Sequence, residues 1–102
     1  MKLVMAVVRP SRVEAVRQAL AAVHVTRLSI ADGQEFLPGP EGGIAQESIL
    51  EIAVNDDFLS RTVDTIAWCG GRGDERRPGA VYVVPIEQAV QIYRDVRGPE
   101  AV

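Results

Sequence analysis

The sequence has one cysteine, Cys69, and one histidine, His24. A single cysteine cannot form a disulfide within the chain, and these two side chains are too few for a multi-thiolate metal site. His24 is expected just past the end of a helix, so no Ser-His-Asp catalytic set is indicated. This scarcity favours a reducing compartment, and it leaves Cys69 as a half-buried, unreactive thiol at a helix end.

Long apolar runs and an excess of basic residues are also absent. The longest apolar run near the start, from Leu3 to Val8, is far shorter than the roughly 18 residues that span a bilayer, and no secretory cleavage signal follows it. The chain has 11 Lys and Arg against 14 Asp and Glu, a net charge of −3, so general attraction to nucleic acid or anionic lipid is not expected. We therefore expect a cytoplasmic protein with no nucleic-acid partner and no membrane insertion.

What the sequence does contain is an alternation of strand and helix patterns over 102 residues, enough for one domain spanning residues 1–102. Continuous apolar runs at 3–8 and 81–84 predict strands that are buried on both faces. Ser11 and Glu14 form a capping-box pair, which predicts the start of a helix. The predicted elements are strands at 3–8, 25–31, 49–54 and 81–84, helices at about 11–22 and 55–69, and a short helix over 86–93.

Two glycine-rich segments separate these elements. Residues 32–43 hold four glycines and two prolines, which predicts a flexible loop over about 33–46. Residues 70–79, GGRGDERRPG, combine free backbone N–H groups with arginines and could cradle a phosphate or a bicarbonate-sized anion. Alternatively, Asp74 and Glu75 pair with Arg76 and Arg77 in a merely solvated loop. The tail over about 97–102 is expected to be loose.

The order of elements is β-α-β-β-α-β, which predicts an α+β fold, the ferredoxin-like sandwich. In this fold a four-stranded antiparallel sheet carries two helices on one face, here followed by a short C-terminal helix. The other face would then be bare, although two of its strands are apolar on both sides. Burial of that face against other copies of the chain predicts a small cyclic oligomer; the alternative is a monomer with an unusually apolar sheet.

Several segments resemble one known family, in order and over nearly the whole chain. These segments are MKLVMAVVRPSRVEAVRQAL, VTRLSIADGQEF, LEIAVNDDF, VDTIAW and VYVVPIEQAVQI. They are similar to the PII signal-transduction proteins, the nitrogen regulators. The resemblance implies a homotrimer with nucleotide sites between subunits. It also implies a regulator, not an enzyme, that controls a partner transporter or enzyme in nitrogen or carbon metabolism.

The chain also departs from the family pattern. Its loop after the second strand is shorter and has no tyrosine to modify, and Glu35 to Leu37 replace a Gly-Phe-Gly segment, so the usual Mg–oxoglutarate site is not expected. Gly73-Asp74 is followed by an altered ERRPG, and Gln91 and Tyr93 replace two basic residues. Because fewer charges face the phosphates, the expected effector shifts from ATP toward ADP, AMP or a small anion such as bicarbonate. No cofactor or metal is required.

The adenosine end of the family site remains, and other arginines, Arg94 among them, could neutralise phosphates. The expected nucleotide-binding residues are Val7, Ser29, Phe36, Glu51 and Ala53 around adenine and ribose, with Arg72, Gly73, Asp74, Arg76, Arg77 and Gly79 near phosphate. One alternative is a trimeric interaction scaffold that has lost nucleotide binding. Another is a metal-binding trimer like the copper-tolerance proteins, which the scarcity of His and Cys disfavours.

Overall fold

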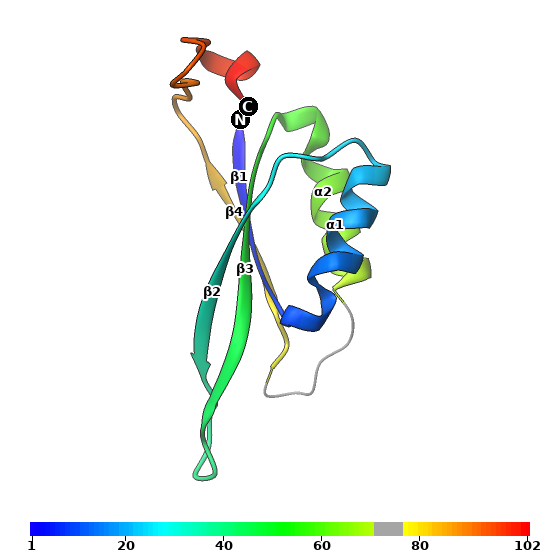
Figure 1. Cartoon of the computed structure of the whole chain (residues 1–102), viewed down its shortest axis with the longest axis vertical. Coiled ribbons are helices and arrows are strands. Elements are labelled where there is room, and N and C mark those ends of the chain that lie inside the picture. The colour runs from blue at the N-terminus through cyan, green and yellow to red at the C-terminus, as the bar shows by residue number, and fades with distance from the viewer. Residues whose placement is uncertain (71–76) are drawn as a thin grey trace.

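The protein folds as one antiparallel sheet covered on one face by two helices (Figure 1). The computed structural model describes residues 1–70 and 77–102. Its elements in chain order are β1 (Lys2–Val8), η1 (Pro10–Arg12), α1 (Val13–Ala22), β2 (Ser29–Phe36), β3 (Ile44–Val54), α2 (Asp56–Cys69), β4 (Ala80–Pro85) and η2 (Gly98–Ala101). The strand order is β2-β3-β1-β4, so the predicted ferredoxin-like α+β fold is confirmed.

Strand β1 lies in the middle of the sheet, paired with β3 on one side and β4 on the other. Its alternate residues, Val4, Ala6 and Val8, are buried beneath the helices, while Met5 and Val7 point to the opposite face and are half-buried. A strand with apolar residues on both faces therefore lies where the continuous run at 3–8 predicts it.

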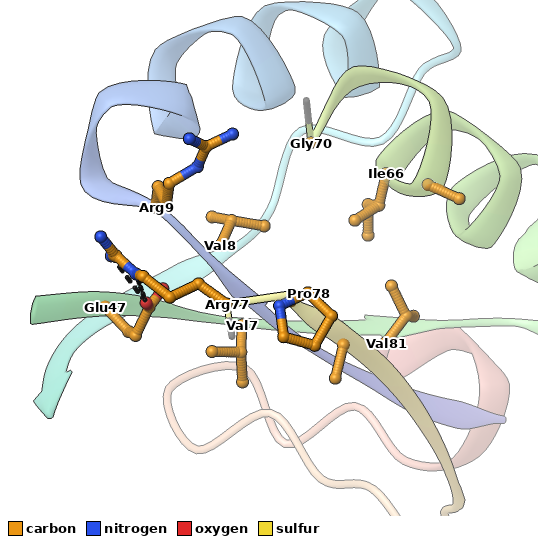
Figure 2. A pocket seen from close by; sticks show the side chains of 12 residues that line it. Val7, Val8, Arg9, Glu47, Ile66, Gly70, Arg77, Pro78 and Val81 are labelled. Atoms are coloured by element: carbon orange, nitrogen blue, oxygen red, sulfur yellow. Dashed lines mark hydrogen bonds and ion pairs between the residues drawn. The ribbon is translucent and has the colours of Figure 1, made fainter. Parts of the chain in front are cut away.

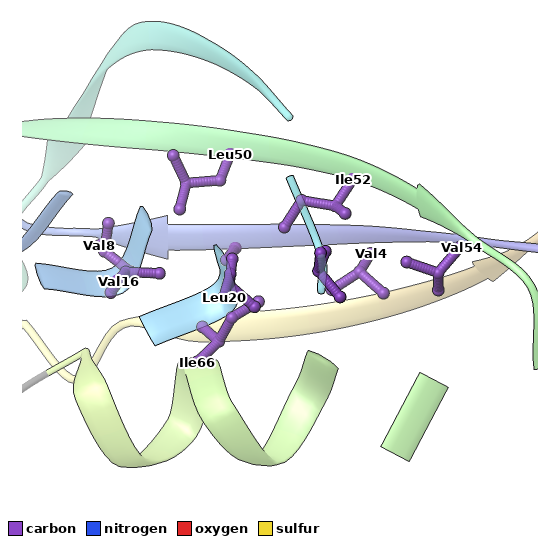
Figure 3. Packing of buried hydrophobic residues seen from close by; sticks show 10 residues of the cluster. Val4, Val8, Val16, Leu20, Leu50, Ile52, Val54 and Ile66 are labelled. Atoms are coloured by element: carbon purple, nitrogen blue, oxygen red, sulfur yellow. The ribbon is translucent and has the colours of Figure 1, made fainter. Parts of the chain in front are cut away.

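The core lies between the sheet and the two helices (Figure 3). Leu20 of α1 and Ile66 of α2 meet Leu50 and Ile52 of β3 and Val4 of β1, and all five side chains are almost completely buried. Each contributes about 1.5–3 kcal/mol of burial free energy. This one-sided core leaves the other face of the sheet without a covering layer.

The prediction of a strand over 25–31 is wrong at its start. The N–H of His24 donates to Ala21 O at 3.0 Å and that of Val25 donates to Leu20 O at 2.9 Å, the hydrogen bonds of a Schellman motif that ends α1. Val25 is buried in the core, so its apolar character reflects the end of a helix and not a strand. The second strand, β2, begins at Ser29.

The loop predicted over about 33–46 is strand at both ends, and only residues 37–43 lie between the two strands. β2 continues to Phe36, β3 begins at Ile44, and these two residues pair directly, so the hairpin projects beyond the helices (Figure 1). The N–H of Leu37 donates to Gly43 O at 2.9 Å and closes the turn. A Cβ at Gly33 would lie 2.9 Å from Ile49 Cδ1, so glycine is accommodated inside a strand where it had suggested a loop.

The short helix predicted over 86–93 is absent. The N–H of Gln91 donates to Val96 O at 2.8 Å, and Val90 forms a β-bridge with Arg97. The apolar residues of this segment are spaced as on one face of a helix, but that face is not buried, since Tyr93 is 99% exposed. The one C-terminal helix is the 3-10 turn η2. Asn55 Nδ2 donates to Pro99 O at 2.9 Å, which connects the tail to the start of α2.

Candidate functional site

The face of the sheet away from the helices carries side chains from all four strands, and we call it the bare face. The antiparallel register places Ser29, Glu51, Met5 and Tyr82 side by side in one row across it. Directly opposed residues of an antiparallel pair point to the same side, so this row is continuous. Val7 lies in the next row, between Ile49 and Ala80. The bare face thus brings together residues that are far apart in the sequence.

One cavity, of about 440 Å³, lies at the end of the bare face near the C-terminal tail. We call it the Glu51 hollow. Its lining brings together Ser29, Glu51 and Ala53, three of the five residues expected around adenine and ribose. The rest of its lining is Leu3, Thr26, Arg27, Leu28, Ala101 and Val102. The exposed carboxylate of Glu51 therefore stands among apolar side chains, such as Leu3 and Leu28, and polar ones, such as Ser29 and Arg27. Such a mixed lining is suited to the hydroxyl groups and ring of a nucleoside.

A second cavity, of about 430 Å³, lies where the hairpin leaves the body of the sheet. We call it the Val7 hollow. It brings together Val7, Phe36 and Gly79, with Tyr82 and Glu47 also in its lining. Phe36 is 79% exposed at the edge of this hollow. The expected adenosine residues therefore line two hollows of the bare face and do not converge on a single one within one chain.

Gly79 brings the start of β4 close to β1. Its φ is +70°, and a Cβ there would lie 3.0 Å from Val7 O, so both the backbone conformation and the contact require glycine. Arg77 lies two residues before this close approach.

Arg77 reaches across β1 to Glu47 of β3 (Figure 2). Its Nε and Nη2 both donate to Glu47 Oε1, at 3.0 and 2.7 Å, and Nη2 also donates to Gln46 O at 2.9 Å. The Glu47 side chain is 5% exposed and that of Arg77 is 26% exposed. The alternative of a merely solvated loop is therefore wrong for Arg77, which forms a largely buried ion pair with β3.

The remaining residues expected near phosphate precede Arg77 in the sequence. Arg72, Gly73, Asp74 and Arg76 lie outside the described residues. Arg94 lines a separate hollow with Arg27 and Tyr93, beside the C-terminal segment. Within residues 1–70 and 77–102, no three His, Cys, Asp or Glu side chains gather as metal ligands. None of the helices in the same part of the chain is long and apolar enough to cross a membrane.

Comparison of the chain with known proteins identifies its family. A family model described as nitrogen regulatory protein P-II matches residues 1–96. The chain belongs to the P-II family. The family resemblance that the sequence indicates is confirmed, and the family is one of signal-transduction regulators.

Relatives of this P-II protein match it over its full length. It is 31% identical to nitrogen regulatory protein GlnK1 of Methanosarcina mazei, over 100% of this chain and 97% of that protein. It is 26% identical to nitrogen regulatory protein P-II of Cereibacter sphaeroides, over 100% of each. The structure of Arabidopsis thaliana PII bound to citrate matches with a TM-score of 0.85 and 27% identity, over 99% of this chain and 91% of that chain.

Glu47 is the site residue of this P-II protein that sequence reasoning missed. No motif contains it, and it lies just before the strand expected over 49–54, in the part of β3 that the structure extends back to Ile44. A carboxylate in a strand next to buried positions requires a partner, and that requirement was the available signal. The structure supplies the partner from the second glycine-rich segment.

Proposed function

We propose that this P-II protein is a homotrimeric regulator that binds an adenine nucleotide (ADP, AMP or ATP) between its subunits. Binding controls a partner enzyme or transporter in nitrogen or inorganic-carbon metabolism, and the protein itself is not an enzyme. The observation that carries the proposal is the Glu51 hollow, where Ser29, Glu51 and Ala53 meet on the bare face. A cytoplasmic location stays a prediction.

The trimer is supported by the apolar character of the bare face. Tyr82 and Val84 of β4 are 58% and 43% exposed there, and Met5 and Ile49 beside them are only half-buried. Contiguous apolar surface of this kind is typical of an interface. Closed cyclic symmetry buries it without leaving a free edge, and a neighbouring subunit would then cover the open side of both hollows.

Nucleotide binding is supported by the chemistry of the two hollows. The Glu51 carboxylate can accept hydrogen bonds from ribose hydroxyl groups, and Val7 offers an apolar contact for a purine ring. Few fixed cations among the described residues face these hollows, which favours ligands of lower charge or a small anion such as bicarbonate. The Arabidopsis thaliana relative was solved with citrate bound, which supports anion binding as a property worth testing here.

Isothermal titration calorimetry with ATP, ADP, AMP and bicarbonate tests the proposal. We expect saturable binding of at least one adenine nucleotide, and Glu51→Gln should weaken ADP and AMP to a similar extent, by about tenfold. Glu87→Gln removes the same charge at an exposed position outside both hollows and should leave affinity unchanged. Absence of heat and of any thermal shift at millimolar nucleotide would contradict the proposal.

The second candidate function is a trimeric scaffold without an effector. It is favoured by the Arg77–Glu47 pair, because an arginine already bound to a carboxylate is not free for phosphate. It is also favoured by Gln91 and Tyr93, which are uncharged where the resemblance implies basic residues. A trimer that binds a partner protein equally well with and without nucleotide would support this candidate.

A further inference from the structure

The ion pair between Arg77 and Glu47 lies at the wall of the Val7 hollow. Glu47 lines both the Val7 hollow and a smaller cavity of about 240 Å³. This smaller cavity lies between β1 and the end of α2, and it is the one of the two that Arg77 also lines. Of the two paired side chains, the Glu47 carboxylate is therefore the one that borders the Val7 hollow.

Arginine binds carboxylates and phosphates through the same geometry, with two N–H groups directed at acidic oxygens. Here both Nε and Nη2 of Arg77 are directed at one oxygen, Glu47 Oε1. Glu47 is 5% exposed, so water can replace few of the hydrogen bonds that the guanidinium group donates to its carboxylate. A phosphate that entered the hollow would meet the negative charge of Glu47 before it met the positive charge of Arg77.

We propose that Glu47 is an internal competitor for Arg77 and selects against ligands with a phosphoanhydride chain. The inference rests on the proposed function, because it concerns the charge selectivity of the same site. The unsubstituted protein is expected to prefer ligands with little negative charge at this end. Removal of the Glu47 charge would release Arg77 to a diphosphate group.

The direct experiment is a calorimetric titration of Glu47→Gln and the unsubstituted protein with inorganic pyrophosphate, ATP and adenosine. Glutamine keeps the shape of the side chain and an acceptor oxygen, so Arg77 stays in place but faces a neutral partner. We expect pyrophosphate and ATP to bind Glu47→Gln at least about tenfold more tightly, and adenosine to bind both proteins equally within about twofold. Equal or weaker pyrophosphate binding by Glu47→Gln would overturn the inference.

Two further variants separate this effect from other causes. Glu41→Gln removes one negative charge at the exposed hairpin turn and should not change pyrophosphate affinity. Glu47→Ala provides the same test as Glu47→Gln if the latter does not give a folded protein by light scattering and thermal melting. If Glu41→Gln strengthens binding as much as Glu47→Gln, net charge is responsible and the inference is wrong.

The outcome is distinguishable from that of the proposed function. Tighter pyrophosphate binding by Glu47→Gln, with no nucleotide bound by the unsubstituted protein, would support the inference and contradict nucleotide regulation. Nucleotide bound equally by both proteins would support the proposed function and overturn the inference. No binding by either protein to any of the three compounds would overturn both.

Discussion

At the scale of single residues, the buried carboxylate of Glu47 has the largest consequence for the account. Among the described residues it is the one acidic side chain that is buried, with 5% exposure. Removal of one partner of a buried pair leaves an uncompensated charge, which costs more than the pair contributes when intact. Loss of Arg77 is therefore expected to destabilise the fold as well as to change the charge of the site.

We predict that Arg77→Ala lowers the free energy of unfolding by about 1.5–3 kcal/mol, because Glu47 loses its charged donors. Arg17→Ala is the matched control, since Arg17 pairs with Glu14 at the surface and its loss should cost at most about 1 kcal/mol. Urea denaturation of the two variants at one protein concentration measures both effects. Equal losses would mean that the Arg77–Glu47 pair behaves as a surface pair.

Asp56 gives the molecule a defined response to acid. The α-amino group of Met1 donates to Asp56 Oδ1 at 3.0 Å and Lys2 Nζ lies 3.4 Å from the same oxygen. The hydrogen bond from Met1 is the largest cause, followed by the charge of Lys2, and together they lower the pKa of Asp56 from its ordinary value of 3.8. Its contribution to stability is therefore present above the unfolded-state pKa and lost as pH falls through the lower, folded-state pKa.

We predict that Asp56→Asn lowers the melting temperature at about pH 6 and that the difference from the unsubstituted protein vanishes at about pH 2. Thermal melts across this range measure it, with Asp57→Asn on the same helix as control. A difference of constant size at every pH would show that Asp56 acts through packing and not through its charge.

At the scale of elements, the end of α1 is held in an unfavourable backbone conformation. His24 has a φ of +68°, the left-handed region that side chains other than glycine adopt at a cost. Its N–H and that of Val25 complete the Schellman motif, a position where glycine is preferred.

We predict that His24→Gly raises the free energy of unfolding by about 0.5–1 kcal/mol, because the strain at this position is relieved while the two hydrogen bonds remain. His24→Ala removes the same imidazole but keeps a Cβ, so it should give no gain. Urea denaturation of both variants distinguishes backbone strain from loss of the side chain. A gain in His24→Ala equal to that in His24→Gly would contradict the explanation.

The elements that the sequence predicts correctly are those whose pattern reflects burial. β1 is a continuous apolar run with alternate residues in the core, and α1 and α2 carry apolar stripes that enter the core. β4 forms where its apolar run predicts a strand, but the expected burial on both faces is wrong within one chain, since Tyr82 to Val84 are exposed. The hairpin was not predictable in this way, because both faces of β2 are exposed for most of its length and no alternation of apolar and polar residues marks it. The segment 86–93 was mistaken for a helix for the opposite reason, since its apolar residues repeat at helical spacing but none of them is buried.

The candidate site was predictable only where the family resemblance supplied it. Ser29, Glu51 and Ala53 meet in one hollow because the β2–β3 register aligns residues that are 22 positions apart, as in the pair Ser29 and Glu51. The Arg77–Glu47 pair joins residues 30 positions apart. Glu47 lies on β3, and Arg77 lies just before β4, which is not a neighbour of β3 in the sheet. No local pattern encodes such a contact.

At the scale of the whole molecule, the proposed trimer depends on the bare face. Val84 and Val83 are adjacent on β4 and equally exposed, at 43% each, but they point to opposite faces. Val84 is paired with Leu3 on the bare face, and Val83 with the buried Val4 on the helix side. They therefore form a matched pair of positions for a test of which face is the interface.

We predict that Val84→Glu dissociates the trimer, because it places a charge in an apolar interface, while Val83→Glu remains trimeric. Size-exclusion chromatography with light scattering measures the mass of each variant. Dissociation by Val83→Glu alone would locate the interface on the other face of the sheet.

The most direct test of the central claim is native mass spectrometry of the unsubstituted protein with ADP. If nucleotide binds between copies of the chain, the ligand should be observed on the assembly. We predict an ion of about three times the 11.1 kDa chain mass, carrying up to three ADP molecules, with no ADP on any monomer. A trimer free of ADP at millimolar ligand, or a monomer that carries ADP by itself, would contradict the account.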